Sequence, residues 1–169
     1  CEVTALCNDA ALAYDSKNGT YNLVGEPTEG ALRVLVEKVG TPDIAHNATR
    51  ASTSPEERLD FSTKHYESQY SRLATYEFSR DRKSMSVLVR NGNSQKLLVK
   101  GAPESILDRC TNAIVGKNGK KIPMSKQLAN LINKEIVEYG NRGLRVIAVA
   151  SVEDIESNPL LAKAKTTKE

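Results

Sequence analysis

Apolar residues recur every three to four positions in several stretches of this chain, and this spacing predicts helices. The clearest case is the segment 27–39, whose apolar side chains form one stripe between Pro27, which suits a first helical turn, and Gly40, which suits a helix end. The segment 125–139 carries an apolar face of the same kind. Residues 3–13 have similar spacing and predict the end of another helix.

Two further helices are predicted from their first residues. The segment 54–71 begins with Ser-Pro-Glu-Glu, in which the Ser can cap a helix, the Pro suits its first position and the last Glu completes a capping box. The segment 103–110 begins with Pro and predicts a short helix. The polar segment 41–53 has neither signal, and it is predicted to be a loop.

Alternating or β-branched segments predict strands, and Asn-Gly pairs predict the tight turns of hairpins. The predicted strands or hairpins are residues 21–24, 73–78, 84–89, 95–99, 114–122 and 144–152, the last of them buried. Because hairpins are interspersed with helices, we expect an α/β fold of the α+β type, with a twisted, mainly antiparallel sheet flanked by helices. One domain is expected to cover residues 1–169, with a tail from about residue 157 that is partly disordered.

Composition narrows the classes of function. A net charge of +3 on 169 residues is too small for the dense basic stripe of a nucleic-acid binder. No apolar run approaches the roughly 20 residues that cross a bilayer. The three cysteines form no close ligand pair and the two histidines stand alone, which argues for reduced thiols in a cytosolic compartment and against a metal site. The first residues carry no signal peptide and read as the interior of a longer chain.

The most informative motif is the segment 78–87, Phe-Ser-Arg-Asp-Arg-Lys-Ser-Met-Ser-Val. It places Phe78 beside cationic side chains that include Arg80, in a chain with only two Phe and no Trp. The ring can stack on a base, with about 1–3 kcal/mol of stabilisation, while the cations face phosphates. The alternative is a Phe that fills the core at a strand end beside solvated Arg residues, and the pattern alone leaves both open.

Other segments have the chemistry of an anion site, each with a structural alternative. Lys100 stands between a strand and a helix start, where backbone N–H groups attract anions, although a plain turn with an exposed Lys has the same pattern. Glu29 could accept a hydrogen bond from an amino group or simply favour the helix dipole. Arg145 opens the predicted strand 144–152 and needs an anion, either a phosphate or a carboxylate of the protein.

Segments 25–29, 78–87, 100–104 and 143–148 occur in the order and rough spacing of one family. They resemble the nucleotide-binding domain of P-type cation-transporting ATPases, most of all the sarco/endoplasmic reticulum calcium pumps. The likeness spans nearly the whole chain. The motif at 78–87 is highly specific for this family. The motif Lys-Gly-Ala-Pro-Glu at 100–104 is shared by several branches of the family and says less about which ion the pump transports.

The resemblance implies a role for each matching position. Phe78 would stack on adenine, and Glu29 would accept from the adenine amino group. Lys83 and Lys100 would line the adenine end, and Arg80 and Arg145 would contact phosphates. The rest of the pocket would be formed by close backbone, apolar walls and flanking polar residues, namely Gly101, Ala102, Met85, Ile147, Thr28 and Glu26.

The resemblance also implies a mechanism. The ligand would be ATP or ADP, with Mg²⁺ carried on the nucleotide. The family's phosphorylated Asp-Lys-Thr-Gly-Thr motif and its magnesium motif are missing from this sequence. The chain is therefore expected to present the γ-phosphate to an aspartate in another domain, and to have no catalytic residue and no turnover by itself.

The resemblance also implies where such a domain works. Its partners would be the phosphorylation and actuator domains of the same pump, on the cytosolic face of an endoplasmic reticulum-type membrane. No nucleic acid, no direct membrane contact and a monomeric isolated domain are expected. Two alternatives remain, namely the same domain from a pump for another cation, and a non-enzymatic binding module with a basic cleft. A freestanding kinase or phosphatase is disfavoured because no base, nucleophile or metal cluster is evident.

Overall fold

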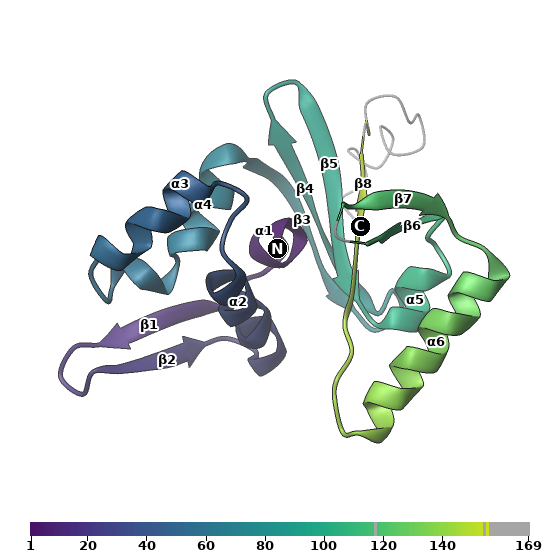
Figure 1. Ribbon diagram of the computed structural model, residues 1–169, viewed down its shortest axis with the longest axis horizontal. Coiled ribbons are helices and arrows are strands. Elements are labelled where there is room, and N and C mark those ends of the chain that lie inside the picture. The colour runs from purple at the N-terminus through teal and green to yellow at the C-terminus, as the bar shows by residue number, and fades with distance from the viewer. Residues whose placement is uncertain (117, 154, 156–169) are drawn as a thin grey trace.

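A four-stranded antiparallel sheet forms the centre of the computed structural model, which describes residues 1–116, 118–153 and 155 (Figure 1). Its strands lie in the order β3-β4-β5-β8. Their bounds are β3 (Ser71–Ser79), β4 (Ser84–Asn91), β5 (Ser94–Gly101) and β8 (Ala148–Val152). The tight turn after Asn91 is possible because Gly92 adopts a φ of 56°. The expected fold class is confirmed, as are the three central strands and their hairpin.

Helices and small hairpins cover the two sides of this sheet (Figure 1). One side carries α1 (Glu2–Leu6), β1 (Ala11–Asp15), β2 (Thr20–Val24), α2 (Pro27–Val39), α3 (Ile44–Thr49) and α4 (Phe61–Gln69), with short 3-10 turns at Arg50–Ser52 and Glu57–Leu59. The other side carries α5 (Pro103–Leu107), β6 (Asn112–Val115), β7 (Lys120–Pro123) and α6 (Lys126–Asn141). Strands β6 and β7 pair with each other, so the predicted hairpin at Asn118-Gly119 is present. Strands β1 and β2 also pair, although residues 11–13 of β1 belong to the segment 3–13, for which a helix is predicted.

The main core lies between the central sheet and helices α1, α2 and α4. Alternate residues of β4 supply apolar side chains from one face, because successive side chains of a strand point to opposite faces. The cluster consists of Ala5, Leu6, Cys7, Val36, Tyr66, Met85, Val87, Val89 and Leu98. This core fixes one end of β4 and β5 beside the start of α2, and that is where the candidate site lies.

Three predictions about helices and loops were wrong in part. The segment 3–13 is a helix only to Leu6. The Asn8 side chain accepts a hydrogen bond from the Ala10 N–H (2.9 Å) and donates one to the Thr4 carbonyl (3.2 Å), and these bonds replace those that would continue the helix. The segment 41–53 contains α3, capped by the Asp43 carboxylate, which accepts from the His46 N–H at 2.9 Å. The capping box of 54–57 forms, yet the α-helix that follows begins only at residue 61.

The segment 144–152 also differs from its prediction. Only Ala148–Val152 is a strand, and Leu144 is 51% exposed, so the segment is not the buried strand that its apolar composition indicates. The predicted helices 27–39, 103–110 and 125–139 are present as α2, α5 and α6, with α5 shorter than expected. No helix in the described ranges combines the length and the apolar character that crossing a membrane requires. The expected disordered tail lies outside the described residues.

Candidate functional site

Lys100 and Glu29 form an ion pair that joins the end of β5 to the first turn of α2. The Lys100 side chain is 8% exposed and that of Glu29 is 21% exposed, so the alternative of an exposed Lys in a plain turn does not apply. The second carboxylate oxygen of Glu29 accepts from the N–H of Asp9 at 3.2 Å. A half-buried carboxylate therefore faces a nearly buried ammonium group, and each compensates the desolvation of the other.

Arg145 reaches the same helix start from the chain segment before β8. Its Nη1 donates to the Thr28 hydroxyl at 2.6 Å, and the side chain is exposed. Among the described residues, no carboxylate forms an ion pair with Arg145, and because the side chain is exposed, its guanidinium keeps donors that face solvent. Ile147 is half-buried two residues further along, and Glu26 is exposed at the N-cap of α2, with no side-chain capping bond.

The turn after β3 brings a further cation, Lys83, to the end of the sheet where Lys100 lies. Lys83 has a φ of 49°, the left-handed region that non-glycine residues rarely occupy. Its carbonyl accepts from the Ala102 N–H at 2.9 Å, and its Nζ lies 3.2 Å from Glu104 Oε1. Bonds to backbone N–H at the helix start and to Lys83 hold the pKa of the Glu104 carboxyl below its usual value.

Gly101 has a structural role in the same region. It pairs with Ser84 across the ladder, and a Cβ on Gly101 would lie 2.3 Å from the Lys83 carbonyl oxygen. The missing side chain therefore makes room for the backbone of the neighbouring turn. Met85 pairs with Lys100 in the register and is 2% exposed, so it underlies this end of the sheet as part of the core.

Phe78 lies at the end of β3 and is 61% exposed. It immediately precedes Ser79, which pairs with Ser84 next to the Gly101 position. The ring does not fill the core, so the structural alternative for this residue is excluded. An aromatic side chain with this exposure is available for stacking.

The two arginines of the turn differ. Arg80 is exposed. Arg82 folds back on the sheet, where its guanidinium donates to the hydroxyls of Ser79 (3.2 Å) and Ser86 (3.3 Å) and to the carbonyl of Glu77. Arg82 is thus occupied by the protein, whereas the Arg80 head group is open to solvent.

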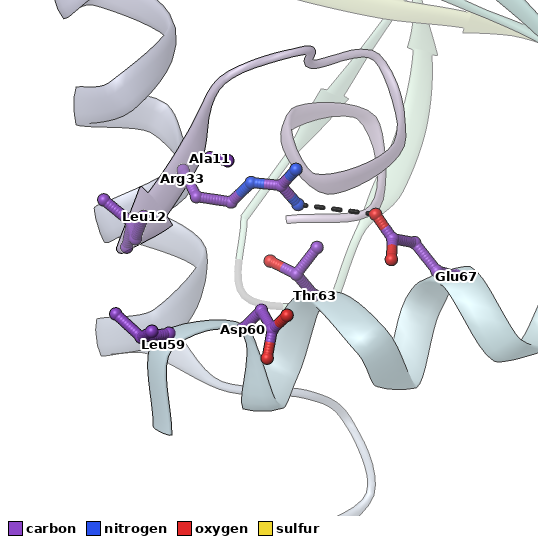
Figure 2. Close-up of a pocket in the computed structure, with 7 residues that line it drawn as sticks. All are labelled: Ala11, Leu12, Arg33, Leu59, Asp60, Thr63 and Glu67. Atoms are coloured by element: carbon purple, nitrogen blue, oxygen red, sulfur yellow. Dashed lines mark ion pairs between the residues drawn. The ribbon is translucent and has the colours of Figure 1, made fainter. Parts of the chain in front are cut away.

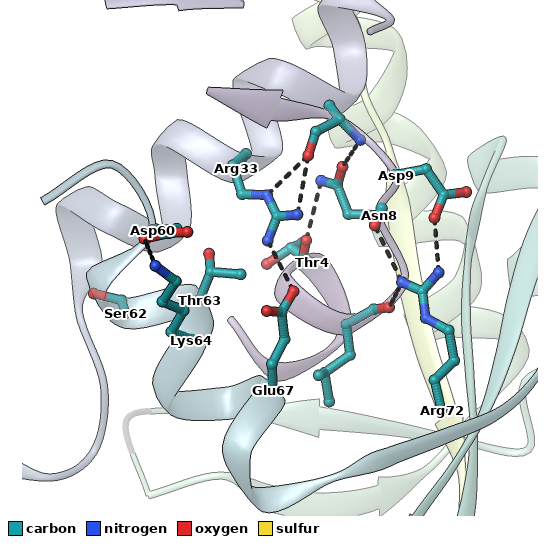
Figure 3. A network of polar contacts seen from close by, with 12 residues as sticks. Thr4, Asn8, Asp9, Arg33, Asp60, Ser62, Thr63, Lys64, Glu67 and Arg72 are labelled. Carbon is teal, nitrogen blue, oxygen red and sulfur yellow. Dashed lines mark hydrogen bonds and ion pairs between the residues drawn. The ribbon is translucent and has the colours of Figure 1, made fainter. Parts of the chain in front are cut away.

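Sequence reasoning missed the polar network that holds the segment after α1. Arg33 donates from Nε and Nη2 to the Ala10 carbonyl at 3.1 and 2.9 Å, and Arg72 contacts the Leu6 carbonyl at 2.6 Å and Asp9 Oδ1 at 2.7 Å (Figure 3). The network positions Asp9, whose N–H binds the Glu29 carboxylate. No local sequence pattern predicts these hydrogen bonds, because the residues that they join are distant in the sequence.

A small pocket of about 90 Å³ lies elsewhere, between β1, α2 and α4 (Figure 2). It is lined by Ala11, Leu12, Arg33, Leu59, Asp60, Thr63 and Glu67, and Arg33 Nη1 lies 3.5 Å from Glu67 Oε1 across it. None of the predicted site residues lines this pocket. Within the described part of the chain, no group of three or more His, Cys, Asp or Glu side chains could hold a metal ion.

Comparison with known proteins shows the family to which this chain belongs. The model of the family described as P-type ATPase, cytoplasmic domain N, matches residues 1–169, and the chain therefore belongs to this family. The resemblance that the sequence motifs indicate is thus confirmed.

Individual relatives narrow the branch. The chain is 60% identical over 168 residues to the endoplasmic reticulum calcium ATPase srcA of Aspergillus fumigatus, an alignment that covers 99% of this chain and 17% of that protein. It is 35% identical over 148 residues to calcium-transporting ATPase 3, endoplasmic reticulum-type, of Arabidopsis thaliana, covering 87% of this chain and 15% of that protein. It is 36% identical over 165 residues to calcium-transporting ATPase 2, endoplasmic reticulum-type, of the same plant, covering 91% and 15%. The chain thus spans less than a fifth of the length of these relatives.

Proposed function

We propose that this chain binds ATP or ADP as the nucleotide-binding domain of an ATP-driven calcium-transporting P-type ATPase. The observation that carries the proposal is the exposed Phe78 ring at the end of the sheet where the backbone positions of Lys83, Lys100 and the segment before β8 with Arg145 also lie. A ring and several cations are the chemical complement of a purine with a phosphate chain. The family and its calcium-pump relatives support the same ligand and the same parent protein.

The adenine end of the proposed site is the region around Phe78 and the Glu29–Lys100 pair. Phe78 stacks on the ring, with about 1–3 kcal/mol of stabilisation. Glu29 accepts from the adenine amino group, which requires its carboxylate to share its oxygens between the ligand, Lys100 and the Asp9 N–H. Gly101 and Ala102 lie at the end of β5 and the start of α5, close to this point.

The phosphate end is formed by Arg80 and Arg145, both exposed in this structure. Each guanidinium can make charge-assisted hydrogen bonds with phosphate oxygens, at about 1.5–3 kcal/mol per bond. Mg²⁺ arrives on the nucleotide and neutralises phosphate charge. The hydrogen bond to the Thr28 hydroxyl keeps the Arg145 side chain near the start of α2 until a phosphate oxygen takes the place of that hydroxyl as the acceptor. The γ-phosphate is then presented to an aspartate of the phosphorylation domain, and the chain itself supplies no nucleophile.

The proposed setting follows from the same family. Residues 1–169 act as one domain whose partners are the phosphorylation and actuator domains of its pump, on the cytosolic face of an endoplasmic reticulum-type membrane. It contacts neither nucleic acid nor lipid directly and is monomeric when isolated.

Titration of the chain with ATP, followed by amide NMR, tests the proposal. Signals of residues 78–83, Lys100 and Arg145 are expected to shift, and Phe78→Ala is expected to weaken ATP binding about 10- to 100-fold. Tyr21→Ala is the control, because Tyr21 is 56% exposed on β2, outside the predicted site residues. Unmoved signals around Phe78, or equal affinities of Phe78→Ala and wild type, would refute the assignment.

A further inference from the structure

The turn at residues 80–83, between β3 and β4, carries two of the proposed nucleotide contacts, Arg80 and Lys83. Lys83 is the non-glycine residue with a positive φ among those the structure describes. For a residue with a Cβ, the left-handed conformation is less favourable than the right-handed one, because the Cβ comes too close to the following carbonyl oxygen. Contacts outside the turn must therefore hold it in this shape.

Two hydrogen bonds from the first turn of α5 meet this requirement. The Ala102 N–H donates to the Lys83 carbonyl at 2.9 Å, and the Ser105 hydroxyl donates to the Arg82 carbonyl at 2.8 Å. The second bond joins residues 23 positions apart, and Ser105 is half-buried. The turn is also closed internally by the Lys83 N–H, which donates to the Ser79 carbonyl at 2.8 Å. The last two carbonyls of the turn are thus both directed at α5.

The two bonds that hold these carbonyls differ in their donors. The donor to the Arg82 carbonyl is the side-chain hydroxyl of Ser105, whereas the donor to the Lys83 carbonyl is the backbone N–H of Ala102. The Ala102 bond belongs to the backbone and survives most substitutions. The hydroxyl of Ser105 can be removed by changing a single atom. Ser105→Ala would leave the Arg82 carbonyl without this partner, and the orientation of the peptide unit between Arg82 and Lys83 would then depend on the bond from the Lys83 N–H to the Ser79 carbonyl.

We propose that Ser105 is a positioning residue for nucleotide binding. This inference rests on the proposed function, because it assigns Ser105 a role through Arg80 and Lys83. The hydroxyl does not touch the nucleotide. It holds the peptide plane between Arg82 and Lys83, and so fixes the direction in which the cations of the turn face the ligand before it arrives. Fixing these cations in advance reduces the entropy lost on binding.

The test compares Ser105→Ala, Ser105→Thr and the control Ser68→Ala in the full chain. Ser68 is a matched control, since its hydroxyl also donates to a backbone carbonyl at 2.8 Å, in the exposed part of α4. Affinities for ATP and for adenosine are measured by NMR titration, and unfolding is followed in urea. Adenosine reports on the stacking end, because it carries no phosphate for Arg80.

Ser105→Ala is expected to weaken ATP binding about 2- to 10-fold, the worth of one hydrogen bond, and to weaken adenosine binding less. Ser105→Thr keeps the hydroxyl and is expected to restore ATP affinity, while Ser68→Ala binds as wild type does. Unchanged ATP affinity in Ser105→Ala, equal losses for ATP and adenosine, or no restoration by Thr would each overturn the positioning role. If the wild-type chain itself binds no ATP, the proposed function fails first, and the positioning role fails with it.

Discussion

Replacement of Gly101 by Ala tests the close approach of β5 to the turn before β4. An ideal Cβ at this position would lie 2.3 Å from the Lys83 carbonyl oxygen and 2.8 Å from both Cα and Cβ of Ser84. The atoms nearest to it are backbone, so rotation of a side chain does not relieve the clash. Gly101 is also held on its other side, where it pairs with Ala148 of β8.

The magnitude follows from two effects. Overpacking at a tightly packed position costs about 1–3 kcal/mol. The displaced Lys83 carbonyl also loses its bond from the Ala102 N–H, which contributes about 0.5–1.5 kcal/mol. We expect Gly101→Ala to lower the free energy of unfolding by about 2–4 kcal/mol, and the melting temperature by about 5–15 °C for a domain of this size.

Urea denaturation followed by circular dichroism measures this change as a shift of the midpoint at constant slope. Gly140→Ala is the matched control, because in the described part of the chain a Cβ at Gly140 in α6 would meet no atom within 4 Å apart from its chain neighbours and the backbone of its own helix. That variant is expected to gain about 0.5–1 kcal/mol from helix propensity. A Gly101→Ala variant as stable as wild type would refute the steric reasoning.

Two other features give further predictions. The buried Glu37 carboxylate accepts two backbone N–H groups at 2.9 Å in the first turn of α4, so Glu37→Gln is expected to lower the free energy of unfolding in urea by about 1–3 kcal/mol, whereas Gln at the exposed Glu135 changes it little. Burial raises the pKa of the Cys7 thiol from 9.0 to about 11. The stability that the protonated thiol contributes is therefore complete below pH 9 and is lost as the pH rises towards 11. At pH 8 a thiol reagent is expected to label the exposed Cys1 at once and Cys7 only on unfolding, and fast labelling of Cys7 in the native chain would contradict its burial.

Strands β3, β4 and β5 and helix α2 could be predicted from the sequence because their signals are local. Alternation marks β4 and β5, Gly92 marks the turn between them, and Pro27 with Gly40 marks the two ends of α2. Each signal acts within a few residues, so no knowledge of the rest of the fold is needed. The motifs at 78–87 and 100–104 likewise place their strands and turn correctly.

The remaining elements depend on contacts between distant residues. The first turn of α4 is capped by Glu37, 25 positions earlier, so the predicted start at residue 54 was too early. Asn8 ends α1 with its own side chain, in competition with an apolar pattern that continues to residue 13. The exposure of Leu144 cannot be deduced from its apolar type, which indicates burial.

For the candidate site, the sequence supplied the residue types but not their partners. The sequence is compatible with either a ligand contact or a helix-dipole role for Glu29, and in the structure its carboxylate faces Lys100 and the Asp9 N–H. The sequence is compatible with either stacking or core packing for Phe78, and its exposure in the structure decides against core packing. Such choices depend on three-dimensional neighbours that no local pattern records.

The contacts that assemble the candidate site connect remote parts of the chain. Glu29 and Lys100 are 71 positions apart, and Thr28 and Arg145 are 117 positions apart. Closing such long loops is slow, and its entropic cost must be met before the contacts form. We therefore expect the site to form late in folding, and a shortened chain that ends before Arg145 would keep the segments 25–29, 78–87 and 100–104 but lack the contact between Thr28 and Arg145. Ligand binding by this chain would accordingly serve as a reporter of its complete folding.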